Sequence, residues 1–301
     1  MTQEESRCGF IAVIGPPNVG KSTLINALVG DKVAIVSHKA QTTRSPLRGI
    51  AIAGSAQLVF IDTPGIFAPR RRLDRAMVAS AWAGVQDADI AACMLDAQHG
   101  LDEVTTNVLA RLRQVERSKI LVINKIDRVR KPSLLQLAAT ANKPAQFAAT
   151  FMISALTGDG VADLKAWLAA HVPAGPWHYP EDQVTDAPLR QLAAEITREQ
   201  LYSRLHQELP YQATVETDQW QELRDGSIRI EQTIYLERES QRKIVLGKAG
   251  STIKAIGSQA RSAIAKMSEA PVHLFLFVKV REGWSDDPER YRAMGLEFPK
   301  K

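Results

Sequence analysis

Cysteine is scarce in this chain of 301 residues, and it contains no long hydrophobic run. The two cysteines, Cys8 and Cys93, stand far apart, which argues against a disulfide framework and favours a reducing cytosol. No apolar stretch reaches the roughly 20 residues that a membrane-spanning helix needs, and the polar, acidic start MTQEESRCGF carries no signal-peptide pattern. We therefore expect a cytoplasmic protein whose contact with a membrane, if it has one, is peripheral.

The composition is that of an ordinary globular protein with about two domains. Apolar residues make up 45% of the chain and charged residues 24%, which is enough material for sizeable cores. The 38 basic residues outnumber the 33 acidic ones, so the formal net charge is +5. That mild excess is compatible with an anionic partner but does not require one.

The stretch GPPNVGKST, from Gly15 to Thr23, lies between an apolar run and a helical pattern. It matches the template G-x-x-x-x-G-K-[ST], whose backbone N–H groups wrap a phosphate chain. Gly15 and Gly20 would allow the close approach, Lys21 would reach the outer phosphates, and Ser22 would offer its hydroxyl to Mg²⁺. The positive N-terminal end of the following helix would add to this phosphate site.

Short β-rich runs alternate with helical patterns through the first half of the chain. The expected strands span residues 10–14, 47–53, 57–61, 90–95, 119–123 and 147–153. The expected helices span residues 21–29, 73–85, 103–115, 132–140 and 161–169. Such alternation indicates a mostly parallel sheet with helices on both faces, whose ligands bind beyond the carboxyl ends of the strands.

Three further motifs stand at the ends of expected strands. In DTPG, Asp62 can hold Mg²⁺ through water, and the Gly65 N–H can face a terminal phosphate. In NKID, Asp127 can accept hydrogen bonds from the N1–H and the exocyclic amine of guanine, which adenine does not offer in that arrangement. The pair Ser154-Ala155 suits a backbone contact with the guanine oxygen. Each motif alone could be an ordinary loop or helix cap, but four of them at four strand ends indicate a guanine-nucleotide site.

This set of motifs resembles the P-loop GTPases of the translation-factor class. The stretch QTTR, residues 41–44, is similar to the switch I region of the Era group, in which a threonine closes over Mg²⁺ when the γ-phosphate is present. The sequence leaves Thr42 and Thr43 open for this role, and we favour Thr43. The resemblance implies GTP or GDP with Mg²⁺ as cofactors, and Ser22, Thr43 and Asp62 as metal ligands.

The residues expected to bind the nucleotide all lie in these motifs. They are Gly15, Pro16, Pro17, Asn18, Val19, Gly20, Lys21, Ser22, Thr23, Asp62, Thr63, Pro64, Gly65, Asn124, Lys125, Asp127, Ser154 and Ala155.

Ile66 stands where Ras-like proteins carry the glutamine that orients the attacking water. A hydrophobic side chain cannot position water, so slow intrinsic hydrolysis is expected. Relatives with this substitution carry an asparagine, matching Asn18, that helps to bind K⁺; Asn18 could equally be a loop residue that stabilises its own turn. The expected catalytic residues are Asn18, Lys21, Thr43 and Gly65.

The sequence changes character near residue 171. Residues 172–182 are rich in proline and have no period, which is typical of a linker. A long helical pattern opened by Pro188 follows, then strand patterns at 213–216 and 227–237 with the hairpin signal Asp225-Gly226 between them. The remaining patterns indicate a helix at 242–246, the tetrapeptide GKAG, a helix at 251–267 and a strand at 272–280.

GKAG, residues 247–250, is a G-x-x-G loop between two helices, and such a loop clamps about four nucleotides in KH domains. Between Ser240 and Arg281, eight basic residues face one acidic residue, so this segment carries +7 and the rest of the chain is slightly acidic. A G-x-x-G loop alone could be a helix corner, but this concentration of charge fits a nucleic-acid backbone. The expected RNA-binding residues are Lys243, Ile244, Gly247, Lys248, Ala249, Gly250, Ile253 and Lys254.

The element order of the second half resembles a type II KH domain, and the whole resembles the bacterial Era GTPase family from about Gly9 to Arg281. The expected layout is an α/β G domain at 1–172, a linker at 173–186, an α+β KH domain at 187–285 and a tail at 286–301. The resemblance implies a monomeric GTP switch that binds 16S rRNA near its 3′ end and assists assembly of the 30S ribosomal subunit. It also implies a fraction bound peripherally to the cytoplasmic face of the inner membrane. Ala249 departs from the glycine of many members, but the outer glycines are intact.

Two other functions are compatible with parts of the sequence. A purely RNA-binding protein with a degenerate nucleotide site is argued against by the intact Lys21, Ser22, Asp62 and Asp127, and a nucleotide-binding assay separates the two. A GTPase of tRNA modification would share the TTR region, but those proteins carry their G domain inside other folds and lack the KH arrangement. A tandem GTPase is excluded because one complete motif set is present.

Overall fold

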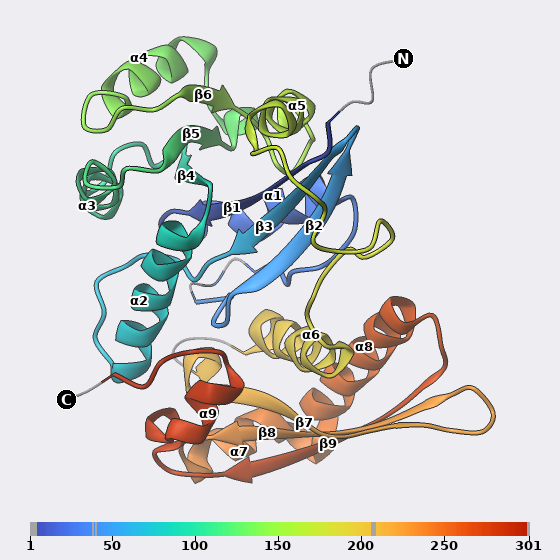
Figure 1. Ribbon diagram of the computed structural model, residues 1–301. Coiled ribbons are helices and arrows are strands. Elements are labelled where there is room, and N and C mark those ends of the chain that lie inside the picture. The colour runs from blue at the N-terminus through green and yellow to red at the C-terminus, as the bar shows by residue number, and fades with distance from the viewer. Residues whose placement is uncertain (1–4, 38, 40, 206–208, 300–301) are drawn as a thin grey trace. The chain divides into compact units, whose positions relative to one another are not determined.

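The computed structural model describes residues 5–37, 39, 41–205 and 209–299, and the chain divides into two compact units (Figure 1). The first unit comprises residues 1–186 and 294–301, and the second comprises residues 187–293. Each unit has its own sheet and its own buried apolar clusters. Two domains were predicted from the length, and the structure has two.

In the described part of the first unit, six strands form one sheet in the order β2-β3-β1-β4-β5-β6. The strands are β1 (Arg7–Ile14), β2 (Leu47–Ala53), β3 (Ala56–Asp62), β4 (Ile90–Asp96), β5 (Ser118–Asn124) and β6 (Ala149–Met152). The helices are α1 (Lys21–Val29), α2 (Arg72–Asp87), α3 (Glu103–Leu112), α4 (Lys131–Ala141) and α5 (Val161–His171). Neighbouring strands are parallel except for the β2–β3 hairpin. The predicted α/β fold with a mostly parallel sheet is confirmed.

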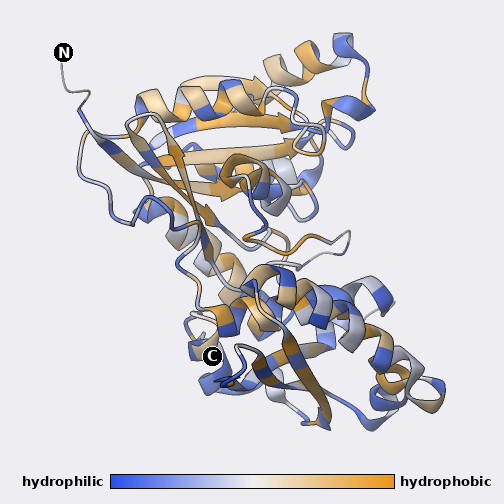
Figure 2. Cartoon of the chain, turned by 90° about the vertical axis from the view of Figure 1, so that its right-hand side faces the viewer, coloured by the Kyte–Doolittle hydropathy of each residue, from blue (hydrophilic) through white to orange (hydrophobic). Residues whose placement is uncertain are grey.

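The central strands of this sheet are apolar on both faces because helices cover them. All seven residues of β4 are buried, and Figure 2 shows hydrophobic residues concentrated on the strands. Each fully buried aliphatic or aromatic side chain contributes roughly 1.5–3 kcal/mol. Cys8 and Cys93 are both buried and free, in agreement with the absence of a disulfide framework. Burial raises the pKa of Cys93 to about 12, so its thiol stays protonated.

The parallel strands bring polar residues to one edge of the sheet. Val13 of β1 is in register with Asp62 of β3, and Asp96 of β4 is in register with Asn124 of β5. The carboxyl ends of four strands therefore lie side by side, and the loops that follow them share one edge.

Residues 173–186, expected to be a linker, lie against the first unit instead. Gln57 of β3 is fully buried, and its Oε1 accepts hydrogen bonds from the backbone N–H groups of His178 (2.9 Å) and Tyr179 (3.0 Å). Its Nε2 donates to the Tyr179 carbonyl at 2.8 Å. One buried side chain thus satisfies three backbone groups of a segment more than 100 residues away.

The same segment also pairs with β2. The Ile50 N–H donates to the Val184 carbonyl at 2.8 Å, and the Thr185 hydroxyl donates to the Arg48 carbonyl at 2.7 Å. Arg48 forms an ion pair with Asp186 at 2.9 Å. The first unit therefore ends at residue 186 and not at 172. The sequence did not predict this packing. The segment is extended and is held by hydrogen bonds to β2 and to Gln57, and such contacts leave no hydrophobic periodicity in the sequence.

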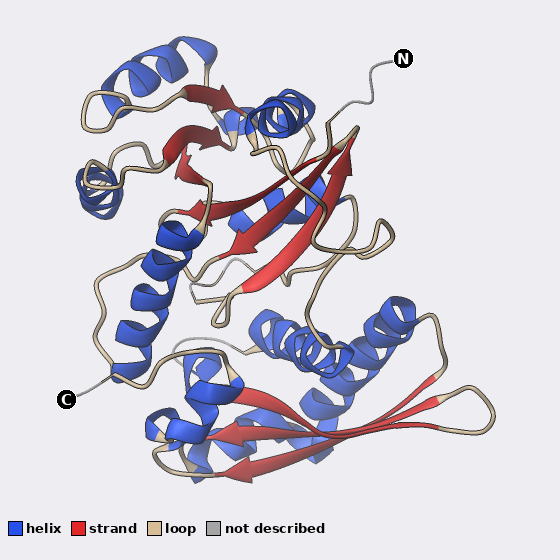
Figure 3. Cartoon of the chain, in the orientation of Figure 1, coloured by secondary structure: helices blue, strands red, loops and turns tan. Residues whose placement is uncertain are grey.

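The described part of the second unit contains a three-stranded sheet, β7-β8-β9, with helices packed against it (Figure 3). The helices are α6 (Leu189–Arg204), α7 (Glu239–Leu246), α8 (Ser251–Ser268) and α9 (Pro288–Ala293). The strands are β7 (Ala213–Glu222), β8 (Ile228–Leu236) and β9 (Val272–Val280). β7 and β8 are antiparallel, whereas β8 and β9 are parallel. The predicted order of helices and strands in a KH domain is confirmed.

The C-terminal residues, expected as one tail from 286, divide between the units. Arg290 of α9 packs over the ring of Tyr235 at 4.0 Å and forms an ion pair with Glu216, so α9 belongs to the second unit. Residues 294–301 are grouped with the first unit, where Phe298 lies 4.9 Å from the Arg72 guanidinium.

Replacing Gln57 by leucine should loosen the segment at residues 173–186. The change keeps the approximate side-chain volume but removes three hydrogen bonds to partly buried backbone groups, each worth about 0.5–1.5 kcal/mol. Hydrogen exchange should then be faster at the amides of His178 and Tyr179. The same substitution at Gln219, which is exposed on β7, is the control and should leave that exchange unaltered. If exchange stays slow in Gln57→Leu, other contacts hold the segment.

Candidate functional site

A cavity of about 390 Å³ lies at the carboxyl edge of the larger sheet, and all four predicted nucleotide motifs contribute to its wall. The predicted residues that line it are Pro17, Asn18, Gly20, Lys21, Ser22, Thr23, Thr43, Gly65, Asn124, Lys125, Asp127, Ser154 and Ala155. Six other predicted residues, all in the described chain, do not line it: Gly15, Pro16, Val19, Asp62, Thr63 and Pro64. Motifs that are separated by more than 100 residues in the sequence thus meet around one space.

The phosphate-binding loop is fastened to the NKID loop by a buried amide. Asn124 donates from Nδ2 to the Val19 carbonyl at 2.7 Å, and its Oδ1 accepts from the Ala155 N–H at 2.9 Å. Gly20 has φ +98°, and a Cβ atom there would lie 2.4 Å from Asn124 Nδ2. Only glycine allows this contact, so the second glycine of the template is required by the neighbouring asparagine as well as by the loop's own turn.

Lys21 is buried and turned back onto its own loop. Its Nζ donates to the carbonyls of Gly15 at 3.2 Å and Pro16 at 3.0 Å. Burial lowers the pKa of Lys21 to about 8, and the nearby Asp62 partly opposes this shift. A buried cation held by two neutral carbonyls is suited to exchange them for an anion such as a phosphate.

Ser22, Thr43 and Asp62, predicted as metal ligands, lie within hydrogen-bonding distance of one another. Asp62 Oδ2 accepts from Ser22 Oγ at 2.7 Å and from Thr43 Oγ1 at 3.0 Å, and the two hydroxyls are 3.1 Å apart. The hydroxyl of Thr42 instead donates to the Lys39 carbonyl at 2.7 Å, so Thr43 is the threonine that faces the other two residues. Two hydroxyls and a carboxylate are hard oxygen donors, which fit Mg²⁺.

Ile66 packs into the apolar core and does not face the cavity. Its side chain is 8% exposed and belongs to the cluster that includes Trp82 and Leu95. Its N–H donates to the Gly15 carbonyl at 3.0 Å. The position that follows DTPG therefore contributes no side chain that could orient water in the cavity.

The base-reading residues lie on the other side of the cavity. Asp127 lines the cavity and is exposed, with its Oδ2 3.9 Å from Arg128 Nε. The side chain of Ser154 is buried and its Oγ accepts from the Thr157 N–H at 3.2 Å. The pair Ser154-Ala155 is expected to offer a backbone N–H to a guanine oxygen; the Ala155 N–H donates to Asn124 Oδ1 and the Ser154 N–H to the Asp159 carbonyl. Ala155 therefore lies beside the NKID loop, but its donor is already engaged.

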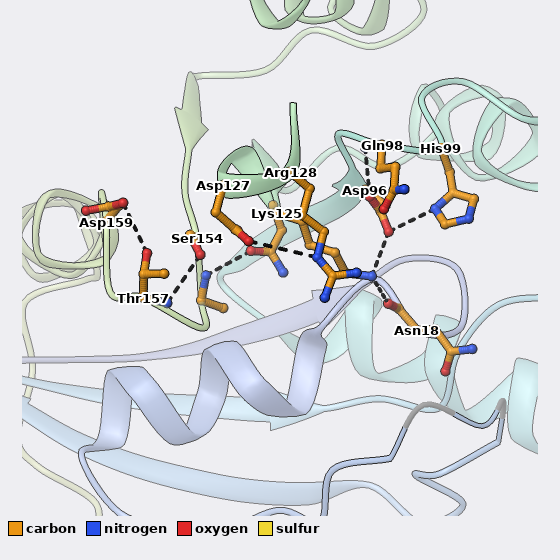
Figure 4. A network of polar contacts seen from close by, with 12 residues as sticks. Asn18, Asp96, Gln98, His99, Lys125, Asp127, Arg128, Ser154, Thr157 and Asp159 are labelled. Carbon is orange, nitrogen blue, oxygen red and sulfur yellow. Dashed lines mark hydrogen bonds and ion pairs between the residues drawn. The ribbon is translucent and has the colours of Figure 1, made fainter. Parts of the chain in front are cut away.

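The sequence analysis missed several residues of this site, among them Ile35, Val36, Ser37 and Lys39, which line the cavity. His99, Arg128 and Leu156 also line the cavity, and Leu156 is 74% exposed there. Asp96, at the end of β4, does not line the cavity itself but binds Lys125, which does (Figure 4). The strand-end criterion that identified Asp62 and Asn124 could have found Asp96, because the expected strand at 90–95 stopped one residue short of it.

The GKAG loop forms an exposed turn between α7 and α8. Gly247 has φ +73°, and a Cβ atom there would lie 2.8 Å from the Thr252 backbone nitrogen. Ala249 adopts φ +50°, a left-handed conformation that suits glycine better. Of the predicted RNA-binding residues, Lys243, Ile244, Lys248, Ala249 and Lys254 are exposed, Gly247, Gly250 and Ile253 are half-buried, and Ile253 packs against the core. Lys243, Lys248 and Lys254 are thus accessible together with the loop's Ala249.

Among the helices that the structure describes, none combines the length and the apolar character that crossing a bilayer requires.

Comparison with known proteins finds two family matches. Residues 10–125 match the family described as 50S ribosome-binding GTPase, and residues 208–285 match the KH domain. The chain is 65% identical to GTPase Era of Bradyrhizobium sp. (strain BTAi1), over 98% of this chain and 96% of that protein. It is 61% identical to GTPase Era of Rhizobium meliloti (strain 1021), over 98% of this chain and 94% of the relative.

Two solved structures share both units of the chain. Era of Aquifex aeolicus, a variant bound to GDP and AlF₄⁻, aligns with a TM-score of 0.91 at 35% identity, covering 96% of this chain and 99% of the other. Era in complex with MgGDPNP and nucleotides 1506–1542 of 16S ribosomal RNA aligns with a TM-score of 0.92 at 35% identity and the same coverage.

Asparagine in place of Asp127 should weaken GDP binding by roughly 100-fold and favour xanthine nucleotides. Two hydrogen bonds to a charged acceptor contribute about 1.5–3 kcal/mol each, and asparagine offers one acceptor and one donor, which match the second carbonyl of xanthine. Titration of fluorescent GDP and XDP measures both affinities. Lys21→Ala is the control and should weaken both nucleotides alike. A variant that still prefers GDP would remove Asp127 from base reading.

Proposed function

This chain belongs to the Era family of GTPases, and from that premise we propose that it is a GTP-driven switch acting on ribosomal RNA. The observation that carries the proposal is the meeting of four guanine-nucleotide motifs around one cavity, in a chain that also holds a KH unit. GTP binding and hydrolysis would occur in the first unit, and RNA binding in the second.

Different residues around the cavity would bind different parts of the nucleotide. Lys21 and the backbone of the loop would bind the outer phosphates, and Asp127 would pair with the guanine edge. Ser22, Thr43 and Asp62 would hold Mg²⁺, which neutralises phosphate charge when it is bound. The hydrogen bonds among these three side chains support this assignment, because they already lie close together.

Slow hydrolysis is the second part of the proposal. The burial of Ile66 removes from the cavity the side chain that orients water in Ras-like proteins. Asn18, which lines the cavity in the phosphate-binding loop, would bind a K⁺ ion that adds positive charge beside the phosphates. A slow reaction of this kind suits a timer of an assembly step better than a metabolic conversion.

The RNA partner is proposed from the KH unit and from the relative's complex. The relative of 35% identity holds nucleotides 1506–1542 of 16S ribosomal RNA. We propose that the second unit of this chain binds the same rRNA near its 3′ end through the GKAG loop, and that the protein assists assembly of the 30S subunit. The exposed Lys243, Lys248 and Lys254 around the loop favour a phosphate backbone.

The cellular setting is proposed from the family resemblance alone. The protein would act as a monomer in the cytoplasm, with a fraction bound peripherally to the cytoplasmic face of the inner membrane. Sedimentation of the purified protein and fractionation of cells test these two points separately.

GTP hydrolysis should be several-fold faster in KCl than in NaCl at equal ionic strength. A K⁺ ion held by Asn18 would supply charge that the site otherwise lacks, and Na⁺ is too small for the same ligands. Phosphate release under single-turnover conditions measures the rates, and Asn18→Ala should abolish the difference while leaving GDP binding within a few-fold. Equal rates in both salts, in the wild type and in the variant, would sink the K⁺ proposal.

Lys248→Asp combined with Ala249→Asp should reduce RNA affinity at least tenfold and leave GTP affinity intact. The loop must approach phosphates, and the new negative charges would repel them; loss of Lys248 should also lower the salt dependence of binding by about one phosphate contact. Filter binding to 16S rRNA 3′-end oligonucleotides at several salt concentrations measures both effects. Lys143→Asp, on the exposed surface of the first unit, is the control. If the double variant binds RNA as tightly as the wild type, the GKAG loop does not bind RNA and is only a turn between two helices.

A further inference from the structure

Asp96 lies at the carboxyl end of β4, behind the NKID loop, and belongs to none of the predicted nucleotide motifs (Figure 4). We propose that Asp96 is a positioning residue for guanine-nucleotide binding, which acts by holding Lys125 against the phosphate-binding loop. The inference rests on the nucleotide binding proposed above and adds a residue that determines its strength.

The Lys125 ammonium joins two loops of the site. Its Nζ donates to Asp96 Oδ2 at 2.6 Å and to the Asn18 carbonyl at 2.6 Å. Both distances are slightly shorter than the roughly 2.7–2.9 Å that is usual for charge-assisted N–H···O hydrogen bonds. The lysine therefore links the loop that reads the base to the loop that wraps the phosphates, and Asp96 supplies the countercharge.

The carboxylate of Asp96 is itself held firmly. Its side chain is 5% exposed, Oδ1 accepts from the Gln98 N–H at 2.8 Å, and Oδ2 lies 3.0 Å from His99 Nδ1. Burial would raise the pKa of Asp96, but the hydrogen bonds from Lys125, Gln98 and His99 outweigh it and lower the pKa. Asp96 is therefore ionised at neutral pH and offers a fixed negative charge to the ammonium.

Both ends of the Lys125 bridge have a left-handed backbone conformation, which lysine rarely adopts and asparagine adopts more readily. Lys125 has φ +65° and Asn18 has φ +63°, in the left-handed region that disfavours most non-glycine residues. Such conformations persist where neighbouring contacts determine them. The bridge from Asp96 through Lys125 to Asn18 provides those contacts.

A second side chain, that of Asn124, joins the same two loops, but it is neutral. Asn124 links its loop to the Val19 carbonyl through a neutral amide, whose oxygen is satisfied by the Ala155 N–H. Lys125 brings a charged group that is 23% exposed, so it needs an opposite charge. The nearby Asp127 lies 3.9 Å from Arg128 and faces the cavity. Asp96 thus has a role that Asn124 does not duplicate.

The test is a double-mutant cycle on the full-length protein. Asp96→Asn keeps the shape of the side chain and removes its charge, and Lys125→Met keeps the length of the side chain and removes the ammonium. We expect Asp96→Asn to weaken GDP and GTP by the same factor, about tenfold, because both nucleotides would contact the two loops that Lys125 joins. The double variant should bind no more weakly than Lys125→Met alone.

The matched control is Asp89→Asn, at the residue that precedes the opposite end of β4. Asp89 accepts from the Phe10 N–H at 2.8 Å, so its replacement also removes a hydrogen-bonded carboxylate next to β4 but should leave nucleotide affinity within twofold. Melting of the nucleotide-free proteins compares the structural cost of the two changes.

Three outcomes decide between the proposals. Unchanged affinity in Asp96→Asn would overturn the positioning role. Losses that add in the double variant would also overturn it, because Asp96 would then act on the site without Lys125. A wild-type protein that binds no guanine nucleotide would instead overturn the proposed function.

Discussion

Parallel pairing of β3, β1, β4 and β5 is the constraint on which the nucleotide site depends. Parallel strands end at the same edge, so residues far apart in the sequence, such as Asp62 and Asn124, reach one cavity without any local signal that joins them. The apolar cores on both faces of the sheet keep those ends in register. The arrangement of the proposed nucleotide-binding residues at this edge is therefore a consequence of how the strands pair.

The loops beyond the strands are then joined by polar side chains that are buried or partly buried. Asn124 and Lys125 hold two consecutive carbonyls of the phosphate-binding loop, and Asp96 holds Lys125. Because buried polar groups must be satisfied, each of these contacts limits the positions that its loop can adopt. The residues for base recognition and for phosphate binding are in this way parts of one network.

The β2–β3 hairpin is attached both to the nucleotide cavity and to residues 173–186. It begins four residues after Thr43 and ends at Asp62, so it connects two of the proposed metal ligands. Its outer strand and Gln57 also hold residues 173–186, which lead directly into α6. The chain that leaves the first unit is thus attached to the same hairpin as the residues around the nucleotide cavity.

The sequence by itself determined the parts of this protein that obey local rules. Phosphate-loop spacing, hydrophobic periods and the G-x-x-G turn indicated the two domains, the mostly parallel sheet and most of the cavity lining, because each depends on residues close together in the chain. Only the tertiary structure decided which threonine faces Asp62, that Ile66 is buried, that Asp96 supports Lys125 and that residues 173–186 pack on the first unit. Those features depend on contacts between segments that are distant in the sequence. A single polar residue forms no periodic pattern, so the sequence gives no sign of the contact that it makes.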